Sequence, residues 1–187
     1  MTPLRTERLV LRNWEERDRP LFHRLNSDET VMEFFDFRRS LAESDAFMDL
    51  LRAANAERGY GFAAVERAAT GETIGFVGIH PVEMPPHLPA GTTEIGWRLA
   101  PEFWGQGFVT EAARTWLATA FEQLAVDEVV AFAVWSNRRS IAVMERLGMR
   151  RDIGADFDHP RVVEPSLRRH VLYRLTRQEW QAADAAG

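Results

Sequence analysis

Apolar and polar positions along this chain follow two different periods, and the period changes from segment to segment. Alternation at every second residue predicts strands, and apolar positions three and four residues apart predict amphipathic helices. Strands are predicted over residues 4–14, 62–66, 73–79, 94–99, 127–134, 149–153 and 170–175. Helices are predicted over residues 16–26, 41–58, about 110–124, 137–147 and, in the tail, 177–186. The mixture of both element types indicates an α/β (α+β) fold, and the absence of repeats or linkers predicts one domain over residues 1–187.

Local signals fix several of these boundaries. Ser40 with Glu43 three residues later forms a capping box at the start of one helix, and Gly148 stands where a helix ends. Residues 80–91 are rich in proline, so no regular element is expected there, and residues 154–169 are polar and irregular.

Residues 31–37 carry several large apolar side chains in a short segment that fits no period. Two interpretations stay open: the segment is core beneath a connection between helices, or its aromatic rings line a substrate pocket. The pocket interpretation would also involve the irregular residues 80–91 and 154–169.

The most informative segment covers residues 94–111, where a strand ends at Pro101, a Gly-Gln-Gly turn follows, and a helix begins. Such a turn directs several backbone N–H groups and the positive end of the helix dipole toward one point, which suits a phosphate. Gly105 and Gly107 allow the main chain to approach a ligand closely and to adopt a positive φ. Taken alone, Gly-x-Gly is also the sequence of many ordinary turns.

Two common phosphate-binding loops are excluded. A Walker loop requires a lysine, and this chain has none, so its 23 basic side chains are all arginine. The dinucleotide-binding fingerprint requires a third glycine at a position that Thr110 occupies here.

The segments Glu94-Ile95-Gly96-Trp97, Trp104-Gly105-Gln106-Gly107-Phe108-Val109-Thr110-Glu111-Ala112 and Asn137-Arg138-Arg139-Ser140 before Leu147-Gly148-Met149 occur in this order. Together with Thr6-Glu7-Arg8-Leu9 near the N-terminus, they resemble the GCN5-related N-acetyltransferases (the GNAT superfamily), and most closely its RimJ/RimL-like branch, which acetylates ribosomal-protein N-termini. The resemblance runs from about residue 4 to residue 180. It implies a twisted, mixed but mostly antiparallel sheet of about seven strands flanked by helices, with acetyl-CoA between strands 4 and 5, which splay apart.

The resemblance also implies the roles of individual residues toward acetyl-CoA. Main-chain groups of Trp97, Arg98 and Leu99 would pair with the pantetheine arm, and one N–H near Leu99 would serve the oxyanion. Asn137 and Ser140 would reach the cofactor from the second half of the chain. The pyrophosphate would be held by the N–H groups of Trp104, Gly105, Gln106, Gly107, Phe108 and Val109, at the start of the helix that includes Thr110. The chain departs from the superfamily loop at Trp104 and Val109, neither of which removes a backbone donor.

Two side chains are the candidates for catalysis. Glu94 matches the glutamate of the RimL-like motif and is expected to act as general base, directly or through a water, with a solvated strand residue as the alternative. Ser140 is expected to protonate the leaving thiolate, with a serine bonded back to a main-chain carbonyl as the alternative. Many superfamily members have a tyrosine where this chain has Met144, and Tyr173 is the second choice of donor.

Composition narrows the class of protein further. The net charge of −5 argues against nucleic acid as a partner, and the lack of cysteine argues against a covalent acetyl-enzyme on sulfur, so direct attack by an amine is expected. Without a signal peptide or a membrane-spanning stretch, a cytoplasmic protein with no membrane partner is expected. No metal is expected, since His80 and His87 lack a third ligand in sequence.

Two classes of function are therefore compared: an acetyl-CoA-dependent N-acetyltransferase acting on a protein N-terminus or a small-molecule amine, and a non-catalytic acyl-CoA sensor, which the missing tyrosine at Met144 would suit. The oligomeric state is left open, with a homodimer allowed.

Overall fold

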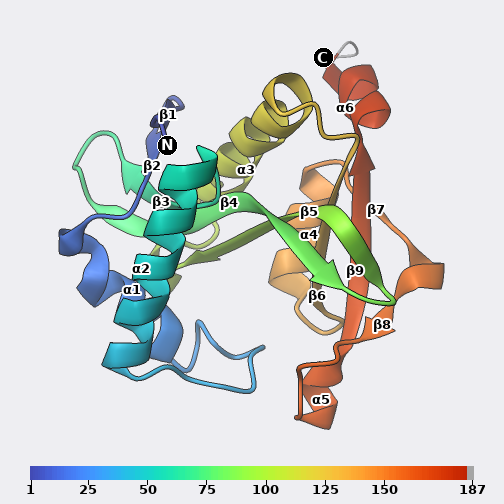
Figure 1. Ribbon diagram of the computed structural model, residues 1–187, viewed down its shortest axis with the longest axis horizontal. Coiled ribbons are helices and arrows are strands. Elements are labelled where there is room, and N and C mark those ends of the chain that lie inside the picture. Colours follow the sequence, from blue (N-terminus) through green and yellow to red (C-terminus); the bar gives the residue numbers. More distant parts are fainter. Residues whose placement is uncertain (185–187) are drawn as a thin grey trace. The chain divides into compact units, whose positions relative to one another are not determined.

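The computed structural model describes residues 1–184 (Figure 1). These residues divide into two compact units, the first formed by Met1–His80 with Gly96–Thr115, the second by Pro81–Ile95 with the chain from Trp116 onward. Strands β4 (Thr73–Met84) and β5 (Leu88–Leu99) and helix α3 (Phe108–Ala118) each begin in one unit and end in the other. The prediction that residues 1–187 form one domain stays a prediction.

The first unit contains an antiparallel sheet with the strand order β1-β2-β3-β4. Its other elements are β1 (Leu4–Arg5), β2 (Leu9–Arg12), β3 (Phe62–Arg67), α1 (Arg19–Ser27), α2 (Leu41–Arg58) and the 3₁₀ turns η1 (Glu16–Asp18) and η2 (Pro101–Phe103). The single strand predicted over residues 4–14 is wrong, because the chain turns at residues 6–8 and β1 and β2 pair as a hairpin. Thr6 fixes this turn, since its Oγ1 accepts a hydrogen bond from the Leu9 amide at 2.9 Å.

Helix α2 begins where the sequence predicts. The Ser40 side chain accepts from the Glu43 amide, and the Glu43 carboxylate accepts from the Ser40 amide at 2.8 Å, which completes the capping box. Helices α1 and α2 lie side by side in this unit (Figure 1). The apolar side chains between these helices and the strands include Trp14, Phe22, Leu25, Val31, Met48 and Phe76.

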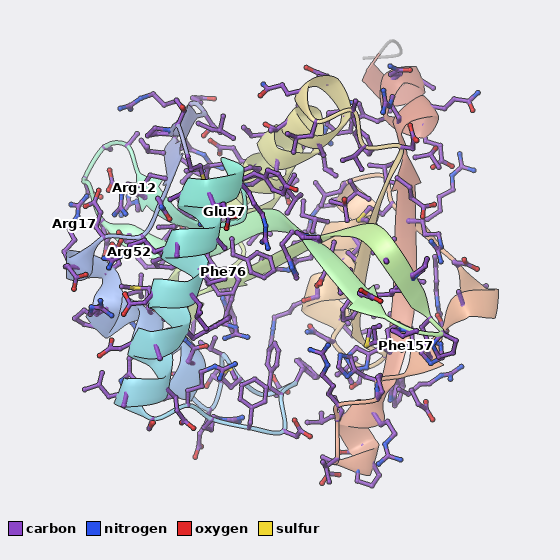
Figure 2. The ribbon with its side chains drawn as sticks, in the orientation of Figure 1. Arg12, Arg17, Arg52, Glu57, Phe76 and Phe157 are labelled. Carbon is purple, nitrogen blue, oxygen red and sulfur yellow. The ribbon has the colours of Figure 1, made fainter. Side chains whose placement is uncertain are left out.

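An ion-pair network centred on the buried residues Arg12 and Asp18 fastens β2 to its neighbours. Arg12 donates to both carboxylate oxygens of Asp18, at 2.7 and 3.0 Å. Arg12 and Arg17, labelled in Figure 2, donate to the same Glu66 oxygen, each at 2.8 Å. Burial alone would raise the pKa of Asp18, but hydrogen bonds from Arg12, the Glu15 amide and Thr73 outweigh it, and the pKa lies below its usual range.

In the second unit, β6 (Glu128–Val134) lies between the first half of β5 and β9 (Arg169–Thr176). The β5–β6 ladder is parallel and joins Thr93–Glu94 to Val129–Val130, whereas β9 is antiparallel to β6. The remaining elements are β7 (Arg150–Arg151), β8 (Phe157–Asp158), α4 (Arg138–Arg146), α5 (Pro165–Arg168), α6 (Arg177–Asp184), the 3₁₀ turn η4 (Ile153–Ala155) and a π-helical turn over Thr119–Gln123.

The proline-rich segment corrects a prediction. Residues 80–91 form the end of β4, a turn at residues 85–87 and the start of β5, instead of an irregular loop. Pro81 and Pro89 lie within the strands, which is allowed because extended backbone accommodates the fixed φ of proline wherever its nitrogen need not donate. The strand predicted at residues 149–153 is only two residues long, and residues 154–169 include β8 and α5.

The other predicted elements are found with shifts of a few residues, and α6 confirms the helical tail as far as residue 184. Residues 185 and 186 of that predicted helix lie outside the described residues. The described chain has nine strands instead of about seven, and three of them are two residues long.

Candidate active site

The Gly-x-Gly turn lies in the first unit, between the short 3₁₀ turn η2 and helix α3. Gly105 has φ of 71° and Gly107 has φ of 80°, so both occupy the left-handed region that glycine favours. Residues 105–107 are exposed, whereas Phe108 is buried and anchors the first turn of α3. The structure therefore confirms that glycine is needed at both positions to build this turn.

The backbone amides of this turn are available to a ligand. Within the described chain, no carbonyl or carboxylate oxygen accepts a hydrogen bond from the N–H groups of residues 105–110, and the first such bond runs from Glu111 to the Gly107 carbonyl at 3.0 Å. Unpaired amides at the N-terminus of an eleven-residue helix are a favourable site for an anion.

The acidic side chain nearest in sequence does not occupy that site. The Glu111 carboxylate accepts from the Thr6 hydroxyl, from the Arg8 amide at 3.0 Å and from Arg8 Nε at 2.6 Å. Burial would raise the pKa of Glu111, but these hydrogen bonds outweigh burial and lower it. Glu111 is therefore ionised and engaged at the β1–β2 turn.

Arg8 is a functional candidate that the sequence did not reveal. Its Nη1 donates to the Gln106 carbonyl at 3.0 Å, and its guanidinium lies 4.6 Å above the centre of the Phe108 ring. It thus braces the turn from about 100 residues away in sequence, and its charge is paired with that of Glu111. The only sequence signal was the N-terminal segment Thr6-Glu7-Arg8-Leu9, which resembles the family without indicating a role.

Trp104 connects the turn to the end of β5. Its indole Nε1 donates to the Leu99 carbonyl at 2.8 Å, so this main-chain oxygen already has a partner. The Arg98 side chain turns toward α1, where Nη1 donates to Asn26 Oδ1 at 2.7 Å. Trp97, Val109 and Thr110 are partly exposed.

Asn137 and Ser140 lie in the second unit, where they begin helix α4. Asn137 is the N-cap, and its side-chain oxygen accepts from the Ser140 amide at 3.1 Å. Among the described residues, no group is within hydrogen-bond distance of the Ser140 hydroxyl, so the alternative of a serine bonded back to a main-chain carbonyl is not found.

Glu94 lies opposite Val130 in the parallel ladder of the second unit and is partly exposed. Its charge acts on His170 of β9, a buried residue that the sequence analysis did not single out. His170 Nδ1 lies 2.9 Å from the Arg168 carbonyl, so this nitrogen carries the proton when the ring is neutral. The pKa of His170 is lowered by burial, which outweighs the raising effects of the Arg168 hydrogen bond and of Glu94.

The other titratable candidates are engaged within the fold. The Tyr173 hydroxyl donates to Glu145 at 3.2 Å, and burial together with the Glu145 charge raises its pKa. Met144 is buried in α4. His80 packs against Phe62 in the first unit, and His87 stacks on Phe157 in the second.

No cluster of three or more metal-ligating side chains exists in the described part of the chain. None of the described helices is both long and apolar enough to cross a membrane.

The mixed sheet flanked by helices is that of a class of acetyltransferases. The family model described as "Acetyltransferase (GNAT) domain" matches residues 8–150. A relative in Aspergillus fumigatus named FsC-acetyl coenzyme A-N(2)-transacetylase is 32% identical over 184 residues, which cover 95% of this chain and 77% of the relative. This chain therefore belongs to the GNAT acetyltransferase family and is an N-acetyltransferase.

Solved structures show the same fold. A GNAT-family acetyltransferase from Bacillus anthracis superposes with a TM-score of 0.79 at 23% identity, covering 95% of this chain and all of that one. Spermidine N-acetyltransferase from Vibrio cholerae, in complex with CoA and spermine, gives 0.73 at 18% identity, covering 94% and 99%. The predicted fold, a mixed sheet flanked by helices in the GNAT arrangement, is confirmed.

Proposed function

We propose that this chain transfers the acetyl group of acetyl-CoA to a primary amine of a small molecule or a protein N-terminus, by direct attack in a ternary complex. The observation that carries the proposal is the set of unpaired amides at residues 105–110, at the start of α3. These amides fit a pyrophosphate, and Arg8, itself paired with Glu111, holds the turn in place through the Gln106 carbonyl. Bound acetyl-CoA would supply an activated thioester.

The chain's own groups divide into those that bind and those that move protons. The amides of residues 105–109 and the N-terminus of α3 at Thr110 would hold the pyrophosphate. The Trp104 N–H, which the sequence analysis includes, donates instead to the Pro101 carbonyl at 3.1 Å. The main-chain groups of Trp97 and Arg98 that do not pair with β4, with the Leu99 N–H, would hold the pantetheine arm and the oxyanion, since the Leu99 carbonyl is already bonded to Trp104. Asn137 would add a contact from the start of α4.

Glu94 would accept a proton from the attacking ammonium, directly or through water. Ser140 would donate one to the departing thiolate, for which its unengaged hydroxyl is suited. Tyr173 is the weaker candidate because Glu145 holds its hydroxyl and its pKa is raised. Glu94-Ile95-Gly96-Trp97 supports placing the chain in the RimJ/RimL-like branch.

The first test is thermal unfolding with coenzyme A and acetyl-CoA. At one hundred times the dissociation constant, a ligand that binds only the folded state stabilises it by about 2.7 kcal/mol, which shifts the unfolding midpoint by roughly 5–11 °C for a chain of this size. Pantetheine, which lacks the pyrophosphate, should give a much smaller shift. No shift with either coenzyme would refute the proposed site.

The second test is release of free thiol from acetyl-CoA with a panel of amines that includes peptides with free N-termini. Turnover with any of them supports the transferase. Stabilisation by the cofactor without turnover on any amine would favour the alternative function, an acyl-CoA sensor, which buried Met144 would suit.

A further inference from the structure

Two arginines in the first unit differ from the others around them. Several arginines of this unit have a carboxylate partner, among them Arg8, Arg12, Arg17, Arg19, Arg24, Arg52 and Arg67, and Arg38 donates to two main-chain carbonyls. Arg39 and Arg98 have no carboxylate partner among the described residues, and the Nε atom of each is buried without a hydrogen-bond partner. Unpaired donors on buried cationic groups are costly and are rarely retained without a reason.

Arg98 is held in place by aromatic rings and neutral oxygens. Its guanidinium carbon lies 4.4 Å from the centre of the Phe35 ring and 5.4 Å from that of Phe76, which is labelled in Figure 2. Its Nη1 donates to Asn26 Oδ1 at 2.7 Å and to the Leu25 carbonyl at 3.3 Å. These contacts orient the guanidinium without neutralising its charge.

Arg39 has the same kind of surroundings. Its guanidinium carbon lies 4.9 Å from the centre of the Phe37 ring and 4.6 Å from that of Phe47. The rings of Phe35 and Phe37 are 5.9 Å apart edge to face, so they link the two arginines into one cluster. We call Phe35, Phe37, Arg39 and Arg98 the arginine–phenylalanine cluster.

The two positive charges oppose each other. The pKa of Arg98 is lowered to about 9, first by burial and then by repulsion from Arg39. An anion that accepts hydrogen bonds from the terminal nitrogens of both guanidinium groups would offset this repulsion. Phe35 and Phe37 are 37% and 42% exposed and Arg39 is partly exposed, so a ligand from solution can reach Arg39 and pack against the rings.

We propose that the arginine–phenylalanine cluster binds the carboxylate of the acceptor, so that the amine substrate is an amino acid or a similar small molecule carrying both groups. This inference rests on the proposed acetyl transfer and specifies its substrate class. A carboxylate fits better than the cofactor's pyrophosphate, because the amides of residues 105–110 already provide a separate site for that group. Planar guanidinium groups also suit the geometry of a carboxylate.

The experiment compares amino acids with their carboxamides, which keep the amine and replace the carboxylate by a neutral group. The wild type should favour the acids by at least tenfold in kcat/KM. Arg39→Met should remove this preference by raising KM for the acids, leaving the carboxamides and the Kd of coenzyme A unchanged, while Arg39→Lys should retain part of it. Arg58→Met, a change of the same charge on an exposed residue at the end of α2, should behave as wild type.

Calorimetric titration of the coenzyme A-loaded protein with the same acids gives a readout independent of turnover, and unfolding midpoints confirm that each variant folds. Equal use of acids and carboxamides, with Arg39→Met altering neither, would overturn the inference while acetyl transfer stands. Weaker coenzyme A binding in Arg39→Met would assign the arginines to the cofactor instead, and also overturn it. If no amine supports turnover, the transferase proposal fails, and the titrations alone decide whether the cluster binds carboxylates.

Discussion

Replacing Gly105 by alanine tests whether coenzyme A binding depends on the conformation of the Gly-x-Gly turn, separately from the contribution of that turn to the stability of the fold. Gly105 has φ of 71°, and a Cβ built on it meets no other atom within 4 Å. The substitution therefore introduces backbone strain without a steric clash. Gly71, in the turn between β3 and β4, has φ of 70° and the same open surroundings, so Gly71→Ala is a matched control far from the turn in sequence.

The expected loss of stability follows from the left-handed conformation, which costs a residue with a Cβ about 1–2 kcal/mol relative to glycine. At roughly 2–4 °C per kcal/mol for a chain of this length, both variants should unfold about 2–8 °C below wild type. Only Gly105→Ala should also lose affinity for coenzyme A, because relaxation of the strained turn redirects the amides of residues 105–110. A loss of about 1.4 kcal/mol corresponds to a tenfold increase in Kd.

The assay is titration calorimetry with coenzyme A beside thermal unfolding of wild type, Gly105→Ala and Gly71→Ala. Reduced stability in both variants with weaker binding in Gly105→Ala alone supports the assignment. If Gly105→Ala binds coenzyme A as wild type does while unfolding at the lower temperature, the turn is ordinary structure and the reasoning about its amides is refuted.

Three further predictions concern single side chains. Glu94→Gln should lower kcat at neutral pH by about 10²–10⁴-fold with coenzyme A affinity retained, as expected for a general base, and unchanged turnover would exclude that role. Arg8→Met should raise the Kd of coenzyme A several-fold by releasing the Gln106 carbonyl, whereas Arg17→Met, a change at an exposed arginine, should leave this Kd unchanged. Titration calorimetry measures both values, and an unchanged Kd in Arg8→Met would contradict the prediction. Because the pKa of Asp18 is lowered in the folded state, the wild type should lose stability as the pH falls below about 4. Urea unfolding at pH 3–7 should show less of this loss in Asp18→Asn, which should itself be about 3–5 kcal/mol less stable than the wild type at neutral pH. An equal dependence of stability on acid pH in both proteins would contradict the prediction.

Local signals in the sequence predicted the features that depend on local backbone chemistry. The capping box at Ser40, the left-handed glycines at 105 and 107, and the helix end at Gly148 all depend on residues within one or two turns of one another. Proline misled the prediction for residues 80–91, because it breaks helices reliably but is tolerated in strands where its nitrogen need not donate.

Contacts between distant segments could not be predicted. The pairing of Arg8 with Glu111 spans 103 residues, and nothing in either local segment indicates it. For residues 31–37, the core interpretation is confirmed at Val31, whereas Phe35 and Phe37 expose their rings and their place in a substrate pocket stays a prediction. Whether an arginine has a carboxylate partner is likewise a property of the folded chain, so Arg39 and Arg98 look in sequence like any other arginine.

The use of arginine for every basic position gives those two residues their significance. A guanidinium can form a forked ion pair or lie flat on an aromatic ring, and the first unit uses it in both ways. Where the partner is a carboxylate, as for Arg12 with Asp18, the charge is satisfied within the protein and the pair fastens elements together. Where the partners are phenylalanine rings, as for Arg39 and Arg98, the side chain is oriented but no carboxylate neutralises its charge, which a bound anion could pair with. Because local rules that a fold breaks at a cost in stability are most often broken at functional sites, the unpaired arginines are where the acceptor's chemistry should be sought.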